Sequence, residues 1–495
     1  MATQLANEGV VLETQLVIDN TPRPAAGGKT FERRSPTTGQ VITRAAAASA
    51  ADAIAAADSA QVAFQAWSKT GPSERRRVLL KAADILETKT PAIIEAMAKE
   101  VGAATLWGGF NVFLAAGLLR EAAGLATQIQ GETIPTDKPG AMSMTVRQPV
   151  GVILSIVPWN GPVVLAARAI AYPIVCGNTV VFRASETSPK THALLAEAFH
   201  EAGLPPGVLN VVTNDPDDAA EVIDALIAHP AVRRINFTGS TRVGRIIAMK
   251  AAPHLKRCLL ELGGKAPLVV LDDADIDEAV KAAVFGSFMY QGQICMSTER
   301  IVVDNKIDDE FVRRFAARAK ELPCGDPGTG AGDCVVGPMV SAGSGPRLNT
   351  VIDDAVAKGA KLVAGGKADG AVMPATILDH VTAEMEIFDY ETFGPITTVV
   401  RATDTDDAVR LANQTEYGLS AGVFGRDTHR ALQVALRIDC GSVHVNGSTV
   451  QNEAQAPYGG MKNSGYGRFD GRAVIDEFTE LKWITIEPLS QPYPF

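Results

Sequence analysis

Gly151-Val152-Ile153-Leu154-Ser155-Ile156-Val157 is a nearly continuous apolar run, and such runs are typical of strands that are buried on both faces of a sheet. Downstream, further strand-like runs alternate with helical patterns as far as Leu260. Strands that alternate with helices in this way pair in parallel and are covered by helices on both sides. The sequence therefore predicts a doubly wound α/β domain, and nucleotide cofactors favour the carboxyl ends of its strands.

A second alternation of strands and helices follows, from residues 266–270 to residues 441–446, and it is long enough to form an α/β domain of its own. Between the helical N-terminal part and Gly151, polar and apolar residues alternate over Met142–Val146, which predicts a half-exposed antiparallel strand. The tail segment Glu480–Glu487 is rich in strand formers. We expect it to pair with Met142–Val146, either of this chain or of a neighbouring copy.

Composition narrows the class of protein. The 495 residues are 46% hydrophobic and 21% charged, which is typical of a globular protein with two or three domains. The net charge of −10 argues against nucleic acid or an anionic membrane as partner. We see neither a secretory signal nor an apolar segment of bilayer length, so we expect a cytoplasmic protein. The six cysteines are scattered without metal-ligand spacing, so we expect neither disulfides nor a metal site.

The loop Gly292-Gln293-Ile294-Cys295-Met296-Ser297 places a cysteine between a predicted helix and a predicted strand. A cysteine in a tight, accessible loop is a candidate nucleophile, although an isolated cysteine is more often a small buried hydrophobe. Two other segments supply what a thiol needs to attack a carbonyl group. Val157–Asn160 ends in a side-chain amide donor, and Leu260–Lys265 places the carboxylate of Glu261 in an apolar, glycine-rich setting.

Two segments are candidates for binding a dinucleotide, although no strand is followed by the usual GxGxxG pattern. Phe237–Gly244 turns from a strand into a helix, where glycines and free amides suit a pyrophosphate; a purely structural turn is the alternative. Arg183-Ala184-Ser185-Glu186 follows another strand. The Glu186 carboxylate there suits ribose hydroxyls and repels a 2′-phosphate, which favours NAD over NADP; a helix-capping glutamate is the alternative.

Taken in order along almost the whole chain, several segments resemble the aldehyde dehydrogenase superfamily. They are Pro158-Trp159-Asn160, Gly177–Val181, Phe237–Gly244, Glu261–Lys265, Gly292–Cys295, Glu391–Pro395 and Pro457–Gly465. The resemblance implies a Rossmann-like NAD-binding domain (residues 1–130 and 150–261), an α/β catalytic domain (262–470), and bridging or oligomerisation strands (131–149 and 471–495). It also implies a homodimer or homotetramer.

The resemblance also implies the roles of individual residues. Cys295 attacks the aldehyde, Asn160 and the Cys295 amide form an oxyanion hole, and Glu261 acts as general base. The residues expected to bind NAD are Val157, Pro158, Trp159, Arg183, Glu186, Gly239, Ser240, Gly244, Leu262, Glu391 and Phe393. Many members have Lys-Pro-Ser-Glu where this chain has Arg183-Ala184-Ser185-Glu186. The compact ammonium group of the lysine is thus replaced by the planar guanidinium group of Arg183.

Gly161, Arg168 and Tyr172 are spaced by seven and four residues, which places them on one helix face next to Asn160. Gly161 leaves room for a flat ring, Trp107 offers an aromatic wall, and Arg168 offers a donor to a ring hydroxyl. A structural pairing of Arg168 with a buried carboxylate is the alternative. The combination is similar to aldehyde dehydrogenases of the salicylaldehyde and vanillin type. Further candidate substrate residues are Ile294, Met296, Gln451 and Tyr458.

Three other functions stay open at this point. An aliphatic or broad-range aldehyde dehydrogenase would share the same chemistry. A CoA-acylating enzyme would transfer the acyl group to a thiol rather than to water, and the presence of Glu261 argues against it. A binding protein on the same fold would need none of the three reactive residues, yet Cys295, Glu261 and Asn160 are all present.

Overall fold

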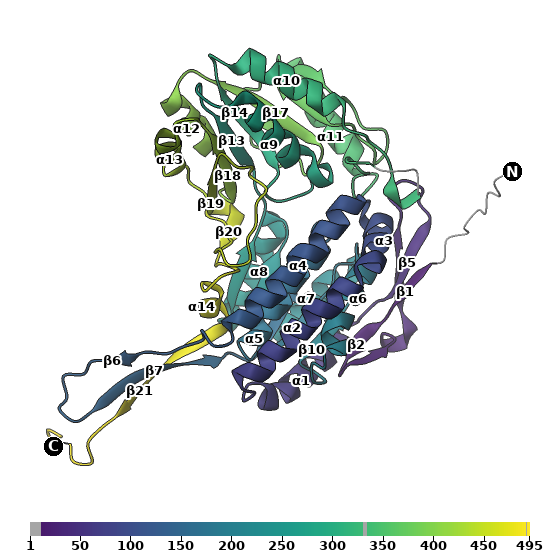
Figure 1. Cartoon of the computed structure of the whole chain (residues 1–495). Helices are drawn as coiled ribbons and strands as arrows, with labels where there is room; N and C mark the ends of the chain where they lie inside the picture. The colour runs from purple at the N-terminus through teal and green to yellow at the C-terminus, as the bar shows by residue number, and fades with distance from the viewer. Residues whose placement is uncertain (1–10, 330–333, 492) are drawn as a thin grey trace.

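The computed structural model describes residues 11–329, 334–491 and 493–495. The alternating polar and apolar residues of the stretch 1–43 predict short antiparallel strands and turns, and the first ten residues of that stretch lie outside the described residues. Figure 1 shows two α/β bodies and a long β arm that extends away from them. The α/β class with two helix-covered sheets and a bridging β element, predicted from the sequence, is confirmed. Among the described residues, no helix is long and apolar enough to cross a membrane.

The first sheet has eight strands in the order β20-β12-β11-β8-β9-β10-β2-β3. Its parallel core consists of β8 (Val152–Ile156), β9 (Thr179–Arg183), β10 (Leu209–Val212), β11 (Val232–Thr238) and β12 (Arg257–Glu261). Antiparallel strands extend it at both edges: β2 (Leu16–Ile18), β3 (Thr21–Arg23) and β20 (Gly465–Tyr466). The chain runs from β8 outward to β10 and then returns to β11 on the other side of β8. The order therefore reverses between β8 and β11, where such sheets open a crevice for ligands.

Both faces of this sheet are buried, as the apolar runs predict. In β8, Ile153 packs into one hydrophobic cluster, whereas Val152, Leu154 and Ile156 pack into another on the opposite face. The first cluster is covered by α2 (Pro72–Thr88), α3 (Thr90–Val101), α4 (Thr105–Leu125), α5 (Pro162–Val175) and α6 (Pro189–Glu201). The second is covered by α1 (Ala50–Trp67), α7 (Ala219–Ala228) and α8 (Thr241–Ala251). This burial fixes the strand ends that carry the candidate site.

The second sheet has seven strands in the order β15-β16-β17-β14-β13-β18-β19, parallel except for β15. The strands are β13 (Ala266–Val270), β14 (Thr298–Asp304), β15 (Lys361–Ala364), β16 (Thr376–Asp379), β17 (Ile396–Ala402), β18 (Ser420–Phe424) and β19 (Ser442–Val445). The helices of this body are α9 (Ile276–Phe288), α10 (Asp308–Lys320), α11 (Ser344–Ala357), α12 (Thr405–Asn413) and α13 (Thr428–Ala435). Alternate residues of β13 and β14 again pack into separate hydrophobic clusters, so this sheet too is covered on both faces.

The arm is a three-stranded antiparallel sheet of β6 (Thr133–Ile134), β7 (Met142–Pro149) and β21 (Thr479–Ile486) (Figure 1). Its register runs from Thr479 opposite Pro149 to Ile486 opposite Met142. Of the two partners expected for the tail strand, the structure therefore shows Met142–Val146 of the same chain. Trp483 is 70% exposed on this arm, and Leu481 and Ile486 are also exposed. Another small sheet joins β1 (Leu12–Thr14), β5 (Val41–Ala46) and β4 (Thr30–Arg34).

Three local expectations differ from the structure. The Ala-rich stretch 45–69, with Ser49 and Asp52 in capping-box relation, predicts one helix. The capping box is confirmed, but the helix begins at Ala50, because Val41–Ala46 forms β5. Ser73, after the break at Gly71-Pro72, is the residue that the sequence suggests as cap of the next helix. This is wrong, since α2 begins at Pro72, which suits a first helical position. Within the range expected for the catalytic domain, β20 pairs with β12 of the first sheet. The division of the chain into domains stays a prediction.

Candidate active site

The two sheets meet at the candidate site. Glu261 is the last residue of β12 and Lys265 immediately precedes β13, so only a short loop joins the carboxyl edge of the first sheet to the amino edge of the second. The Cys295 loop leads into β14, and the segment Glu391–Gly394 leads into β17 at the same edge. Asn160 follows β8 at the carboxyl edge of the first sheet, so the topology brings together the segments that carry the predicted nucleophile, base and amide donor.

The Cys295 loop is held in a strained backbone conformation. The short helical turn before it, Met289–Gly292, contains Tyr290 and Gln291 with φ angles of 48° and 54°. Non-glycine residues adopt this left-handed region only where their surroundings impose it. Here the Gln291 side-chain amide donates to the backbone oxygens of Gly102 and Pro338. These anchors fix the direction in which the loop presents Cys295.

Cys295 and Asn160 line one mainly apolar cavity. The side chains around it include Trp107, Phe110, Leu114, Gly161, Val164, Leu165, Arg168, Ile294, Met296, Val450, Gln451 and Tyr458. Trp107 donates from its indole Nε1 to the Asn160 backbone oxygen at 3.0 Å and stacks on Tyr290. Within the described part of the chain the Asn160 side-chain amide has no hydrogen-bond partner of its own, so it can donate to a group in the cavity.

The Cys295 thiol is neutral at rest. Burial raises its pKa to about 11, an effect that a hydrogen-bonding contact with Tyr458 opposes and the nearby Glu261 reinforces. The Tyr458 hydroxyl lies 3.3 Å from the Cys295 Sγ, and burial raises the pKa of that phenol well above its usual value. A thiol with so high a pKa needs a base before it can attack a carbonyl group.

Glu261 is placed to be that base. Its side chain is buried, and among the described residues neither carboxyl oxygen has a hydrogen-bond partner. A buried polar group without a partner is rare in native structures and is typical of reactive sites. Burial raises the Glu261 pKa well above its usual value, while Arg168 and Arg468 oppose the rise. Gly459 leaves room for it, since a Cβ there would lie 2.8 Å from Oε1.

Arg168 both lines the cavity and forms a buried ion pair. Its Nε and Nη2 donate to the two carboxyl oxygens of Asp470 at 3.1 and 2.7 Å, and the two side chains are 3% and 0% exposed. Burial lowers the Arg168 pKa, but Asp470 together with Tyr458, Glu261 and Tyr172 more than offsets this, and the net shift is upward. The guanidinium also lies 4.2 Å from the centre of the Tyr458 ring. The structural pairing left open by the sequence is therefore present, and Arg168 still borders the cavity.

Tyr172, predicted on the same helix face, is buried close to the Arg168–Asp470 pair. Its hydroxyl donates to the Ala454 backbone oxygen at 3.2 Å, and it is absent from the residues that line the cavity. Its role towards substrate stays a prediction. Asp470 was not identified from the sequence, because nothing near it in the chain marks it as the partner of an arginine 302 positions away.

The predicted cofactor residues of the first sheet follow the ends of its parallel strands. Arg183 pairs with Glu186 at 2.7 Å and donates to Asn214, and Ser240 caps α8. Packing also requires a glycine at position 244, because a Cβ there would lie 2.5 Å from the Leu262 side chain. Val157 and Pro158 follow β8, and Gly239 follows β11. The Glu186 carboxylate suits the ribose hydroxyls of a dinucleotide, and the N-terminus of α8 at Ser240 suits its phosphates, so both fit a dinucleotide bound at this edge of the sheet.

The second sheet contributes Glu391 and Phe393. Glu391 Oε1 accepts a hydrogen bond from the Gly264 amide at 2.8 Å. Burial, with Glu299 nearby, raises the Glu391 pKa to about 7. The rings of Phe393 and Trp159 meet edge to face with their centres 5.7 Å apart. These contacts bring the predicted cofactor residues of both sheets to one place.

Comparison with known proteins agrees with the geometry. A family model described as the aldehyde dehydrogenase family matches residues 23–484. A salicylaldehyde dehydrogenase of Pseudomonas putida is 65% identical over 484 residues, which cover 98% of this chain and 100% of that protein. A vanillin dehydrogenase of Pseudomonas fluorescens is 53% identical over 484 residues, with the same coverage of each chain. The crystal structure of a salicylaldehyde dehydrogenase from Pseudomonas putida G7, complexed with salicylaldehyde, superposes with a TM-score of 0.97 at 65% identity; it covers 98% of this chain and 100% of that one.

Proposed function

We propose, from the premise that the chain belongs to the aldehyde dehydrogenase family, that it oxidises an aromatic aldehyde to the carboxylic acid with NAD. Membership makes it an oxidoreductase and an aldehyde dehydrogenase. The aromatic substrate, benzaldehyde-like with a hydroxyl or methoxyl group, is the step that we add. The similarity to salicylaldehyde and vanillin dehydrogenases over nearly the full length supports it.

One observation carries the proposal: the thiol of Cys295 and the unpartnered amide of Asn160 face one cavity with aromatic and aliphatic walls. Such a cavity favours a flat, apolar ring, because burial of apolar surface supplies most of the binding free energy. The absence of a side chain at Gly161 widens the cavity beside Asn160. A reactive carbonyl on the ring would then lie between nucleophile and amide donor.

The chemistry follows from these positions. Cys295 loses its proton towards Glu261 and its sulfur bonds to the aldehyde carbon, giving a thiohemiacetal. The oxygen that becomes negative accepts from the Asn160 amide and the Cys295 backbone amide, and one such donor typically contributes about 3 kcal/mol. Loss of hydride leaves a thioester on Cys295. After passing the first proton to solvent, Glu261 takes a proton from water, whose oxygen bonds to the thioester carbon. The C–S bond then breaks, the acid is released and the Cys295 sulfur regains a proton.

A bound nicotinamide dinucleotide would accept the hydride. We assign its phosphates to the N-terminus of α8 at Ser240 and a ribose to Glu391. Glu186 favours NAD, because its carboxylate would repel the 2′-phosphate of NADP.

The proposal also includes a homodimer or homotetramer that joins through the exposed arm strands β7 and β21, while a cytoplasmic location stays a prediction.

Substrate choice is tested by NADH formation on a panel of aldehydes. We expect kcat/KM for benzaldehyde and for its 2-hydroxy and 4-hydroxy-3-methoxy forms to exceed that for straight-chain aldehydes. If Arg168 serves the ring hydroxyl, the double variant Arg168→Met/Asp470→Asn loses about tenfold for hydroxylated rings relative to benzaldehyde.

The double variant is needed because removal of one partner from a buried ion pair typically costs about 3–5 kcal/mol of stability. A matched control is Asp379→Asn, which removes another buried carboxylate that pairs with an arginine, Arg401. Aliphatic aldehydes that equal or exceed the aromatic ones would refute the substrate class. An unchanged ranking in the double variant would reduce Arg168 to a structural role. CoA-dependent turnover with acyl-CoA as product would instead favour the acylating alternative.

A further inference from the structure

A buried ion pair lies beneath the segment that carries Glu391 and Phe393. Lys265 Nζ lies 2.7 Å from Glu299 Oε2, and the two side chains are 0% and 4% exposed. Lys265 enters from the start of β13, and Glu299 lies in β14, four residues after Cys295. Neither residue lines the substrate cavity. Charged pairs are rarely buried this completely unless hydrogen bonds also satisfy them, so the remaining contacts of the pair are informative.

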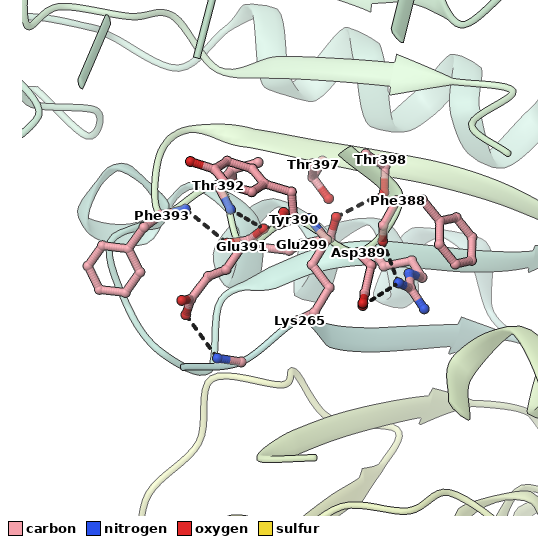
Figure 2. A network of polar contacts seen from close by, with 12 residues as sticks. Lys265, Glu299, Phe388, Asp389, Tyr390, Glu391, Thr392, Phe393, Thr397 and Thr398 are labelled. Atoms are coloured by element: carbon pink, nitrogen blue, oxygen red, sulfur yellow. Dashed lines mark hydrogen bonds and ion pairs between the residues drawn. The ribbon is translucent and has the colours of Figure 1, made fainter. Parts of the chain in front are cut away.

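Those contacts all hold one loop (Figure 2). Glu299 Oε2 also accepts from the Thr392 amide at 2.8 Å, and Oε1 accepts from the Phe393 amide at 3.0 Å. Lys265 Nζ donates a second time, to the Tyr390 backbone oxygen at 2.7 Å. Hydrogen bonds to charged groups are shorter and stronger than neutral ones. The ion pair therefore fixes the backbone on both sides of Glu391, whose side chain turns away towards the Gly264 amide.

The loop needs such support because its backbone is strained. Phe393 has a φ of 47°, in the left-handed region that a bulky side chain rarely adopts. Such a conformation persists only where neighbouring groups impose it, and the Phe393 amide is the group that Glu299 Oε1 binds. The strain aims the Phe393 ring at Trp159.

The loop that carries Glu391 and Phe393 is tightly packed against its neighbours. A Cβ on Gly263 would lie 2.5 Å from Glu391 Oε2, and a Cβ on Gly264 would lie 2.4 Å from the Cys295 backbone oxygen. A Cβ on Gly292 would lie 2.2 Å from the Gly394 oxygen. The loop is thus packed directly against the backbone that carries the nucleophile, so a shift of the loop would misplace Glu391 relative to Cys295.

We propose that Glu299, charge-paired with Lys265, is a positioning residue that holds the Glu391–Phe393 loop in the conformation that binds the nicotinamide end of the cofactor. The inference rests on the proposed function, which assigns Glu391 and Phe393 to the cofactor. Glu299 touches neither substrate nor thiol and acts only through the amides of Thr392 and Phe393. The Cys295 loop keeps its own anchors through Gln291, so nucleophile and cofactor loop can be perturbed separately.

Glu299→Gln tests the proposal, because glutamine keeps the size but offers one acceptor oxygen in place of two. The side-chain NH₂ group of the glutamine would face either the Phe393 N–H or the Lys265 ammonium group. Both partners are hydrogen-bond donors, so one of the two contacts would be lost. We expect KM for NAD and the dissociation constant of NADH, the latter from fluorescence titration, to rise at least tenfold. Hydrolysis of 4-nitrophenyl acetate by Cys295 needs no hydride acceptor, and we expect it to stay within about twofold of the unmodified enzyme.

Asp379→Asn is the matched control, since it removes a buried carboxylate that pairs with an arginine in the same sheet, away from the loop. Asp379 pairs with Arg401 and is 4% exposed. We expect a lowered Tm with unchanged NADH binding. If Glu299→Gln fails to fold, Lys265→Met/Glu299→Gln removes the unpaired charge, and we expect this variant to fold and to show the same loss of NADH binding.

Two outcomes would overturn the proposal. One is unchanged NADH binding and KM for NAD in Glu299→Gln with a Tm loss like that of the control, which would leave Glu299 a purely structural role. The other is lost ester hydrolysis with intact NADH binding, which would place its effect on the thiol. Failure of the unmodified enzyme to oxidise any aldehyde would refute the proposed function, while the NADH titration would still decide the role of Glu299.

Discussion

Replacement of Cys295 by alanine is expected to abolish NADH formation from every aldehyde, with a loss of kcat of about 10⁴-fold or more. Alanine cannot form the thiohemiacetal from which hydride leaves, and no other cysteine lines the cavity in the described residues. NAD binding should persist, because the cofactor contacts are assigned to other residues. The rate is measured as NADH absorbance with aromatic and aliphatic aldehydes, and binding by NADH titration.

Cys258→Ala is the matched control. Burial raises the pKa of Cys258 to about 11, as it does for Cys295, and both thiols are half-buried. Their ionisation alone therefore does not distinguish them; what differs is that Cys295 faces Asn160, Tyr458 and the cavity. We expect Cys258→Ala to stay within about twofold of the unmodified rate. Appreciable NADH formation by Cys295→Ala would refute the assignment of the nucleophile.

The sequence predicted the parallel core of the first sheet because its signal is local. Strands such as β8 and β9 are buried on both faces, and the apolar run Gly151–Val157 predicted β8 to within one residue at each end. The edge strands β2, β3 and β20 have two or three residues each, too few for any alternation to show. Their partners depend on contacts distant in the chain, such as Val17 opposite Val211.

The residues of the site also divide into those that the sequence could identify and those that it could not. Cys295, Glu261 and Asn160 could be proposed because each stands in a short segment of characteristic composition. Asp470 and Glu299 could not, since a buried carboxylate is identified by the cation that it meets in the fold. Every residue of α5 is buried, so its periodicity could not tell that Arg168 borders the cavity whereas Tyr172, one turn further along the same face, does not. Spacing along a helix fixes neighbours but not what they face.

Glu261→Gln is expected to slow steady-state turnover by about 10²- to 10⁴-fold, the usual contribution of a general base. Glutamine matches the shape of the glutamate but cannot take a proton from the thiol or from water. If hydrolysis is the step that suffers most, a rapid first turnover yields about one NADH per Cys295 and then stalls. Stopped-flow absorbance and the mass of the acyl adduct on Cys295 measure this. Unchanged turnover would remove Glu261 from its role.

The pH dependence gives an independent signature of Glu261. Its folded-state pKa is raised well above the usual value, mainly by burial, so protonation is favoured and only the ionised fraction can act as base. The rate of the unmodified enzyme should therefore increase as the pH rises through that elevated pKa. In Glu261→Gln this increase should vanish, and the residual rate should follow only the Cys295 thiol, whose pKa burial still raises above its usual value. A pH profile of kcat/KM that keeps the same rise in the variant would assign it to another group.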